Sequence, residues 1–173
     1  MKKLILVLLS SFTLLACSAV PKDMNIAAET DPKVNLSGYK TFAWLGDATI
    51  IYDEIGRWES PGFDADSEAR FNIDKELRAK GFTEKSDSPD MLITFIAGVD
   101  MDNIELIINE ETQLETLENI PKGALVVAIF DASTGQSIWV GMAEADLQQD
   151  VGSQVAKERL HFAVNEMFKK MKI

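Results

Sequence analysis

The chain has 173 residues, of which 46% are hydrophobic, and this is the size of one domain with a single core. Acidic residues outnumber basic ones by 28 to 17, so the formal net charge is −11. A surface of that charge is repelled by phosphates and anionic lipid headgroups, which argues against nucleic-acid binding and against electrostatic attachment to a membrane.

The N-terminus has the pattern of a secretory signal. Two lysines are followed by an apolar run over residues 4–15. This run is too short for a membrane-spanning helix, which takes roughly 20 residues. Ala16, a small residue, directly precedes Cys17, the only cysteine. We therefore expect a signal peptide over residues 1–16, cleaved between Ala16 and Cys17.

The tetrapeptide Leu14-Leu15-Ala16-Cys17 resembles the lipobox of bacterial lipoproteins. The resemblance implies that Cys17 carries an S-diacylglycerol group and an N-palmitoyl group and becomes the first residue of the mature chain. The alternative is an ordinary signal peptide followed by an unpaired thiol, which is a liability in an oxidising compartment. Ser18 follows the cysteine, where aspartate typically holds Gram-negative lipoproteins in the inner membrane. We thus expect a lipid anchor in the outer membrane, facing the periplasm.

A lipidated tether is predicted over residues 17–35, which contain two prolines and no apolar period. A flexible tether of that size reaches roughly 20 to 25 Å. One domain over residues 36–173 follows. Its first predicted strand covers residues 37–45, with Phe42 and Trp44 on the face that meets the core.

A long loop is predicted over residues 46–63, which include three glycines and a proline. Long loops are often functional, so we single out Trp58 as a candidate contact residue. The alternative we favour is that Trp58 covers the core. A helix is then predicted over residues 64–80, because acids open this segment, bases close it and Gly81 stops it.

The middle of the chain predicts two strands and a short helix. The strands cover residues 91–97, a nearly continuous apolar run, and residues 104–108. Asp100 and Asp102 between them are interpreted as solvated turn acids, because the pattern of a calcium loop fails at the positions after them. A short acidic helix is predicted over residues 110–120.

The last third predicts a hairpin and a helix. Two strand-like runs over residues 124–145 are joined by a short loop with Asp and Gly. Within the second run, Gly141 gives the ring of Trp139 room to pack. Residues 153–172 have the clearest helical period of the chain, and His161 lies beside its apolar stripe as a surface residue. The expected fold class is α+β: an antiparallel β-sheet with two main helices packed on one face, in the order β-α-β-β-β-α plus the short acidic helix.

Several short motifs follow one another in an order that resembles one family, the bacterial lipoproteins of domain of unknown function 4136. The likeness covers about residues 31–168. The motifs are Tyr39-Lys40-Thr41-Phe42-Ala43-Trp44, Lys80-Gly81-Phe82, Pro89-Asp90-Met91-Leu92-Ile93, Gly123-Ala124-Leu125-Val126-Val127, and Asp131-Ala132 leading to Trp139-Val140-Gly141. Val140 stands where the family often has arginine, so no role of that arginine is carried over. The resemblance implies an α+β domain in the cell envelope and supplies no reaction.

No catalytic constellation stands out in the sequence, and neither a cofactor nor a metal site is expected. The first hypothesis is therefore a non-catalytic envelope module that offers a sheet edge or an open sheet face to an envelope protein. One alternative is a carrier or sensor of a small apolar ligand or lipid, held between sheet and helices near Trp58 and Met167. Another is an envelope hydrolase that uses paired carboxylates.

Overall fold

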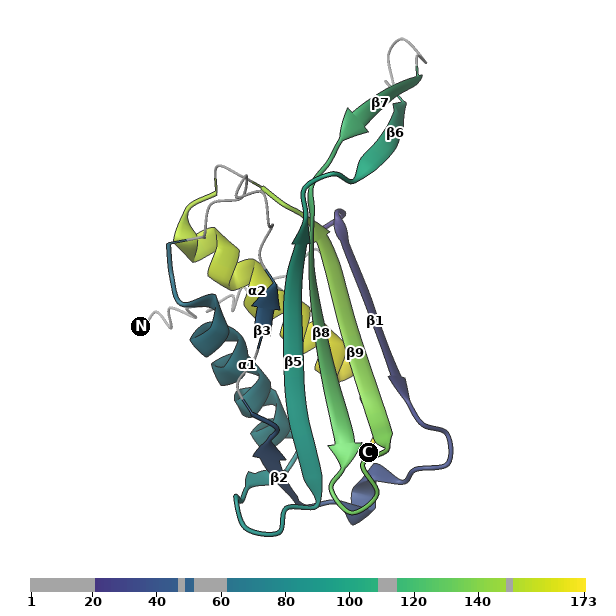
Figure 1. Cartoon of the computed structure of the whole chain (residues 1–173), viewed down its shortest axis with the longest axis vertical. Coiled ribbons are helices and arrows are strands. Elements are labelled where there is room, and N and C mark those ends of the chain that lie inside the picture. The colour runs from purple at the N-terminus through teal and green to yellow at the C-terminus, as the bar shows by residue number, and fades with distance from the viewer. Residues whose placement is uncertain (1–20, 47–48, 52–61, 109–114, 149–150) are drawn as a thin grey trace, which may run out of the picture.

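The computed structural model describes residues 21–46, 49–51, 62–108, 115–148 and 151–173. These residues form a seven-stranded sheet with two helices packed on one of its faces (Figure 1). The sheet strands are β1 (Met24–Thr30), β2 (Thr41–Trp44), β3 (Thr49–Ile51), β4 (Thr83–Glu84), β5 (Met91–Asp100), β8 (Lys122–Asp131) and β9 (Ser137–Asp146). The helices are α1 (Ala65–Ala79) and α2 (Ser153–Lys169). No helix in this described part of the chain is long and apolar enough to cross a bilayer.

The strand order is β1-β9-β8-β5-β2-β4, and β3 also pairs with β5. The predicted α+β class is confirmed, but the antiparallel character holds for only part of the sheet. β5, β8, β9 and β1 are antiparallel neighbours, whereas β2 and β3 run parallel to β5, and β4 runs parallel to β2. The chain passes through α1 between β2 and β5, and such a helical crossover brings two strands together in parallel.

The predicted tether is wrong for residues 24–30. These residues form the edge strand β1, which pairs with β9 along its whole length, from Met24 opposite Ala145 to Thr30 opposite Trp139. Just before β1, the carboxylate of Asp23 forms an ion pair with Arg159 of α2. The ordered domain therefore begins well before residue 36, and the segment that links it to Cys17 is shorter than the sequence predicted.

The predicted acidic helix is wrong for residues 115–119, which form strand β7 (Glu115–Asn119). Its partner is β6 (Ile104–Ile108), a strand that the sequence did predict. The start of the predicted helix, residues 109–114, lies outside the described residues. In the predicted loop 46–63, residues 49–51 form β3, and residues 47–48 and 52–61 are likewise not described.

The predicted strand over residues 37–45 is confirmed for residues 41–44 only, since Leu36–Gly38 form a short 3₁₀ helix. The remaining predicted elements are confirmed, and local chemistry explains their limits. Asp64 caps α1, since its side chain accepts a hydrogen bond of 3.0 Å from the amide of Ser67. Gly81 ends that helix with a φ of 90°, which favours glycine. The β8–β9 hairpin and α2 occupy nearly their predicted ranges.

The core lies between the sheet and the two helices. Phe42, Ile73, Ile93, Val127 and Phe168 are among the side chains that are fully buried there. These residues come from three strands and both helices, so one apolar layer joins the two halves of the chain.

Trp139 is the largest of the fully buried side chains, which confirms the prediction that it is a packing residue. Its side chain is 1% exposed, and its ring centroid lies 5.0 Å from that of Phe168. A Cβ atom at position 141 would lie 2.4 Å from Cη2 of the indole. Gly141 is therefore the residue that lets the ring lie flat over its own strand.

Candidate functional site

The residues predicted for the site fall into two groups. Ala16, Cys17 and Trp58 lie outside the described residues, so their roles stay predictions. Met167, the predicted neighbour of an apolar ligand, is fully buried in the core.

The other polar residues weighed in the sequence lie at the surface. Asp100 and Asp102 are exposed beyond β5, where the amide of Asp102 donates to the carboxylate of Asp100 over 2.9 Å. His161 is exposed on α2, with its Nε2 atom 3.1 Å from Nζ of Lys75. These contacts are those of surface residues and form no common site.

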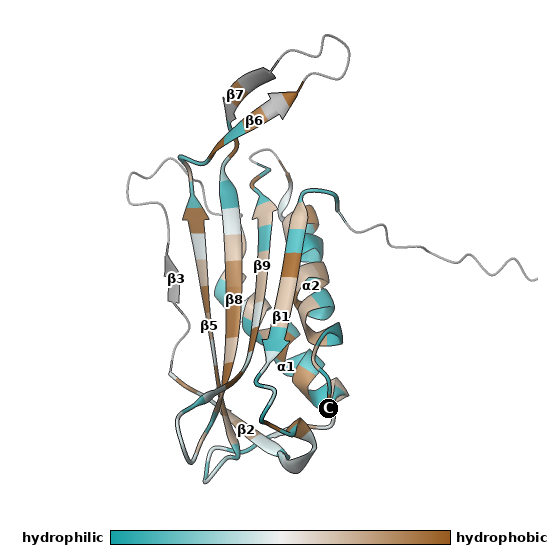
Figure 2. Ribbon diagram, turned by 90° about the vertical axis from the view of Figure 1, so that its right-hand side faces the viewer, coloured by the Kyte–Doolittle hydropathy of each residue, from teal (hydrophilic) through white to brown (hydrophobic). Residues whose placement is uncertain are grey.

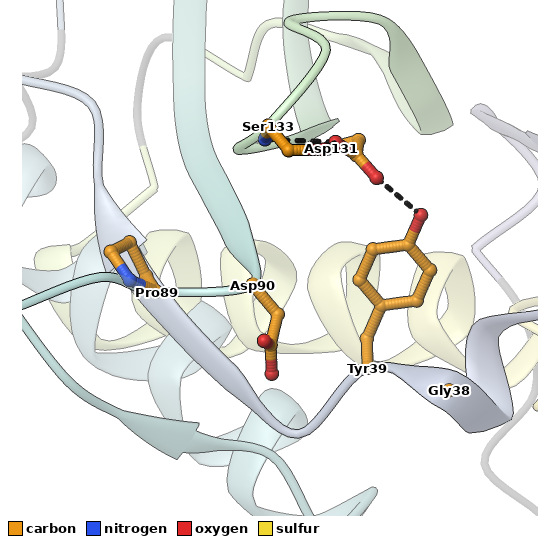
Figure 3. Close-up of a pocket in the computed structure, with 6 residues that line it drawn as sticks. All are labelled: Gly38, Tyr39, Pro89, Asp90, Asp131 and Ser133. Atoms are coloured by element: carbon orange, nitrogen blue, oxygen red, sulfur yellow. Dashed lines mark hydrogen bonds between the residues drawn. The ribbon is translucent and has the colours of Figure 1, made fainter.

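A polar pocket of about 320 Å³ lies at one end of the sheet, where β5 begins and β8 ends (Figure 3). Gly38, Tyr39, Pro89, Asp90, Asp131 and Ser133 line it. Tyr39, Asp90 and Asp131 come from three of the motifs on which the family resemblance rests. The fold thus brings together residues that are up to 92 positions apart in the chain.

Asp131 is the centre of this cluster. Its Oδ2 atom accepts a hydrogen bond of 2.7 Å from the hydroxyl of Tyr39. Its Oδ1 atom accepts bonds from the hydroxyl and amide of Ser133 and from the amide of Thr134. The Ser133 hydroxyl, then the Tyr39 hydroxyl and the Thr134 amide, hold the pKa of Asp131 well below its usual range. The same bond to Asp131 raises the pKa of Tyr39 to about 12.

Asp90 has a similar role at the neighbouring strand. Its Oδ2 atom accepts hydrogen bonds from the amides of Lys40 and Thr41 and from the Thr41 hydroxyl, at 2.8 to 2.9 Å. The two amides, followed by the hydroxyl, lower the pKa of Asp90. Asp90 thus ties the start of β2 to the start of β5.

Two carboxylates at one pocket are what the hydrolase alternative would need. In such enzymes one carboxyl group has a raised pKa and donates a proton. Here the pKa values of Asp90 and Asp131 are both lowered, so neither holds a proton at neutral pH. No group of three side chains suited to a metal ion occurs in the described ranges. The hydrogen bonds of these residues join the segment before β2 to the start of β5 and the end of β8, so we assign this cluster, which we call the polar clasp (Tyr39, Thr41, Asp90, Asp131), to holding strand ends together.

The polar clasp predicts an acid-sensitive fold. A free Asp titrates near pH 3.9, and the native pKa of Asp131 is lower, so its contribution to stability is present above about pH 4 and is lost as the pH falls through the native pKa. Asp131→Asn is expected to lower the urea midpoint at pH 7 and to flatten its dependence on pH below 4. Urea unfolding at pH 7 and pH 3 measures both effects. The control is Asp87→Asn, which changes an exposed acid at the same end of the sheet. If the urea midpoint fell equally between pH 7 and pH 3 in the wild type and in Asp131→Asn, the assignment would be contradicted.

The second candidate site is the sheet face that the helices leave uncovered (Figure 2). Cross-strand neighbours on this face form an apolar row, in which Ala27 lies opposite Met142, Met142 opposite Val126, and Val126 opposite Ile96. Met142 is 37% exposed and Ile96 is 41% exposed. Thr94, which lies opposite Ala128 on β8, is a polar residue on the same face.

Further apolar residues extend the row on either side. Val140, at 38% exposed, lies opposite Ala128, and Phe130 lies opposite Leu92. Asn25, Glu29 and Glu144 alternate with the apolar side chains toward the β1 edge. We call this surface the open face (Ala27, Leu92, Ile96, Val126, Ala128, Phe130, Val140, Met142). An apolar centre with a polar border is typical of a protein interaction site.

Sequence reasoning found part of these sites. It recognised that both sides of β8 are apolar, but it placed the strand wholly in the interior, whereas its outer side is half-buried on the open face. It did not select Asp90 or Asp131, although each stands at a strand end inside a quoted motif. The sequence does contain a signal for these two residues, because an acid stands next to the apolar run of two different strands.

Comparisons with known proteins agree with this architecture. The family described as "Domain of unknown function (DUF4136)" matches residues 26–171. A solved protein of the same family from Bacteroides thetaiotaomicron is 12% identical, with a TM-score of 0.57 over 87% of this chain and 96% of that one. No curated protein sequence matches the chain.

Two other solved structures share the fold. A PelC dodecamer from Paraburkholderia phytofirmans has a TM-score of 0.51 and 12% identity, over 86% of this chain and 99% of that one. A PDZ domain protein from Parabacteroides distasonis has a TM-score of 0.51 and 16% identity, and the match covers 87% of this chain but only 37% of that longer one. The family match spans nearly every described element, from β1 to the end of α2, and the chain therefore belongs to the family of domain of unknown function 4136.

Proposed function

We propose that this protein is a lipid-anchored, non-catalytic module of the cell envelope that binds another envelope protein through its open face. The observation that carries the proposal is the uncovered apolar row across β1, β9, β8 and β5. A sheet in a monomeric α+β protein normally shows a polar side to water, because exposed apolar area is costly. Here Ile96, Val140 and Met142 remain more than a third exposed at its centre.

The predicted anchor supports a role in the envelope. Lipidation of Cys17 would hold the domain at a membrane that its excess of acidic residues would otherwise avoid. The anchor would also confine the open face to a thin layer beside the membrane, which raises its effective concentration toward a partner held in the same layer.

The occupant we favour is an apolar surface of a different envelope protein. A second copy of this chain is the alternative, and the PelC structure, a dodecamer with the same fold, gives that alternative a precedent. The edge strand β1 offers a further mode, the addition of a strand.

An affinity pulldown from detergent-solubilised envelopes tests the proposal. The wild type is compared with Met142→Lys, which places a charge in the apolar row, and with Phe71→Lys, which changes a side chain that is 64% exposed on α1. We expect one defined partner to be lost from Met142→Lys and retained by Phe71→Lys. Equal recovery with both variants would contradict a role of the open face.

The same pulldown with Cys17→Ser separates the anchor from the binding site. Loss of the partner would mean that anchoring is part of the binding function. Retention would mean that the anchor only sets the location. Recovery of nothing but further copies of this chain would decide for self-assembly.

A further inference from the structure

The β6–β7 hairpin, which we call the arm (Ile104–Ile108 and Glu115–Asn119), projects from one end of the sheet (Figure 1). Each strand has five residues, so the paired part is about 17 Å long. An isolated two-stranded hairpin is only marginally stable in water. This arm extends away from the core and receives no cover from the helices (Figures 1 and 2).

Four of the six residues on one side of the arm are apolar and exposed. Ile104, Leu106 and Ile108 alternate along β6, and Leu117 lies directly opposite Leu106 on β7. Successive side chains of a strand point to opposite sides, so these four share one side with Asn119 and Glu115, which lie opposite Ile104 and Ile108. Their exposed fractions run from 54% to 74%, above those of Ile96, Val140 and Met142 on the sheet. Such a side is expected to be covered in the working protein.

The base of the arm is held in place. Lys122, the first residue of β8, forms ion pairs with Glu105 of the arm at 2.8 Å and with Asp146 of β9 at 2.6 Å. The side-chain amide of Asn119 donates to the carbonyl of Met101, and that of Asn103 donates to the carbonyl of Ile120. These bonds fix the direction in which the arm leaves the sheet.

The N-terminus of the domain lies at the same end. Met24 starts β1 opposite Ala145, which lies opposite Gly123, which lies opposite Val99 near the end of β5. The start of β1 is therefore about 14 Å across the sheet from the strand that leads into the arm.

The chain before β1 is also fixed. The amide of Met24 donates to the carbonyl of Pro21 over 3.1 Å, and Asp23 pairs with Arg159. Between Pro21 and Cys17 there are only four peptide units, which span at most about 14 Å.

We propose that the apolar side of the arm inserts into the surface of the phospholipid bilayer that holds the Cys17 anchor. The inference rests on the proposed lipidation of Cys17. An anchor within about 14 Å of Pro21 brings this end of the sheet to the bilayer, and an arm about 17 Å long at that end must then meet the lipid. The domain would stand on the membrane at two points, with the open face accessible from the side and the polar clasp at the far end.

The charge of the chain selects the kind of lipid. The acylated chain has lost Lys2 and Lys3 with its signal, so it is more acidic than the full chain and is repelled by an anionic surface. The arm is therefore expected to enter a bilayer of zwitterionic headgroups by its apolar side chains. Glu105, on the opposite side of the arm, is paired with Lys122, whereas Glu115 lies opposite Ile108 on the inserting side, so that end of the arm is expected to stay among the headgroups. A second copy of the arm is the competing occupant.

Site-specific fluorescence of the full-length lipidated protein in phosphatidylcholine vesicles tests the proposal. Acylation consumes the thiol of Cys17, the only native cysteine, so an introduced cysteine can be labelled with a polarity-sensitive dye. The reporter variants are Leu106→Cys and Leu117→Cys on the arm. The control is Ser86→Cys, an exposed position at the far end of the sheet.

We expect the dye at positions 106 and 117 to be severalfold brighter in vesicles and strongly quenched by spin-labelled lipid, and the dye at position 86 to show neither change. Protein that co-floats with vesicles but has no quenching at 106 or 117 would overturn the inference and leave the anchor intact. A brighter dye without quenching, together with a 106-to-106 cross-link, would overturn it in favour of pairing between copies. Protein that does not co-float at all would overturn the anchor and the inference together.

Discussion

Gly141→Ala is expected to lower the free energy of unfolding by about 1–3 kcal/mol, because the added methyl group overpacks a filled core. The new Cβ would lie 2.4 Å from Cη2 and 2.9 Å from Cζ2 of Trp139, and 3.2 Å from Sδ of Met167. The flexible methionine can shift, but the indole is enclosed and 1% exposed. Urea unfolding followed by circular dichroism measures the change.

A double-mutant cycle with Trp139→Phe shows whether the clash with the indole is the cause. Phenylalanine lacks the two indole atoms that crowd position 141. The indole nitrogen is buried without a hydrogen-bond partner among the described residues, so the exchange removes no known bond. We expect the double variant to be less destabilised than the sum of the two single variants. Gly38→Ala, where no atom lies within 4 Å of the new Cβ, is the matched control. Additive effects would contradict the packing account.

Cys17→Ser is expected to move the protein from the membrane fraction to the soluble fraction of the envelope. Each acyl chain contributes about 0.8 kcal/mol per buried methylene, so the loss of several chains removes a stable anchor. The four exposed apolar side chains of the arm give only a weak, reversible attachment in its place. For this test the variant is exported behind a general secretory signal in place of residues 1–16, so that an uncut signal does not retain it.

Ser18→Asp is the matched control for the anchor. This variant keeps the acylated cysteine, so it is expected to stay in the membrane fraction and to change from the outer to the inner membrane. Density-gradient separation of the two membranes and the mass of the N-terminal peptide check both expectations. An N-terminal peptide without acyl groups in the wild type would contradict the anchor.

The strong periodic segments could be predicted from the sequence because their own residues decide their structure. The helix over 153–169 has an apolar stripe that covers the sheet, and the run from Met91 is a nearly continuous series of apolar residues that favour a strand. The packing of Trp139 could also be predicted, because Gly141 has no side chain and leaves room for the large indole ring.

β1 and β7 could not be predicted because their partners decide their structure. The sequence of β1 has two adjacent alanines, which are poor strand formers, and a seven-residue ladder with β9 overrides that preference. In β7, Glu115 and Glu118 favour a helix by propensity, whereas pairing with β6 makes the segment a strand. In both segments, pairing with a neighbouring strand outweighs the local preference of the residues.

The candidate surfaces were hidden for a related reason. Alternating apolar residues in β8 and β9 predict burial on both sides, and only the packing of both helices on one side shows which residues stay open. The polar clasp depends on contacts between residues that are far apart in the chain, such as Tyr39 and Asp131. The sequence does not show which distant residues meet. The correction of the tether had the largest consequence, because it places the proposed anchor near the arm.

The most direct test of the account is photo-crosslinking in intact cells at native expression. A photoreactive phenylalanine analogue replaces Met142 on the open face or Phe71 on α1, of which Phe71 is the more exposed, at 64% against 37%. Random collisions would therefore label position 71 more strongly. The account predicts a discrete cross-linked protein from position 142 and none from position 71. Equal labelling at the two positions, or no product from position 142, would contradict the claim that the open face is a binding surface.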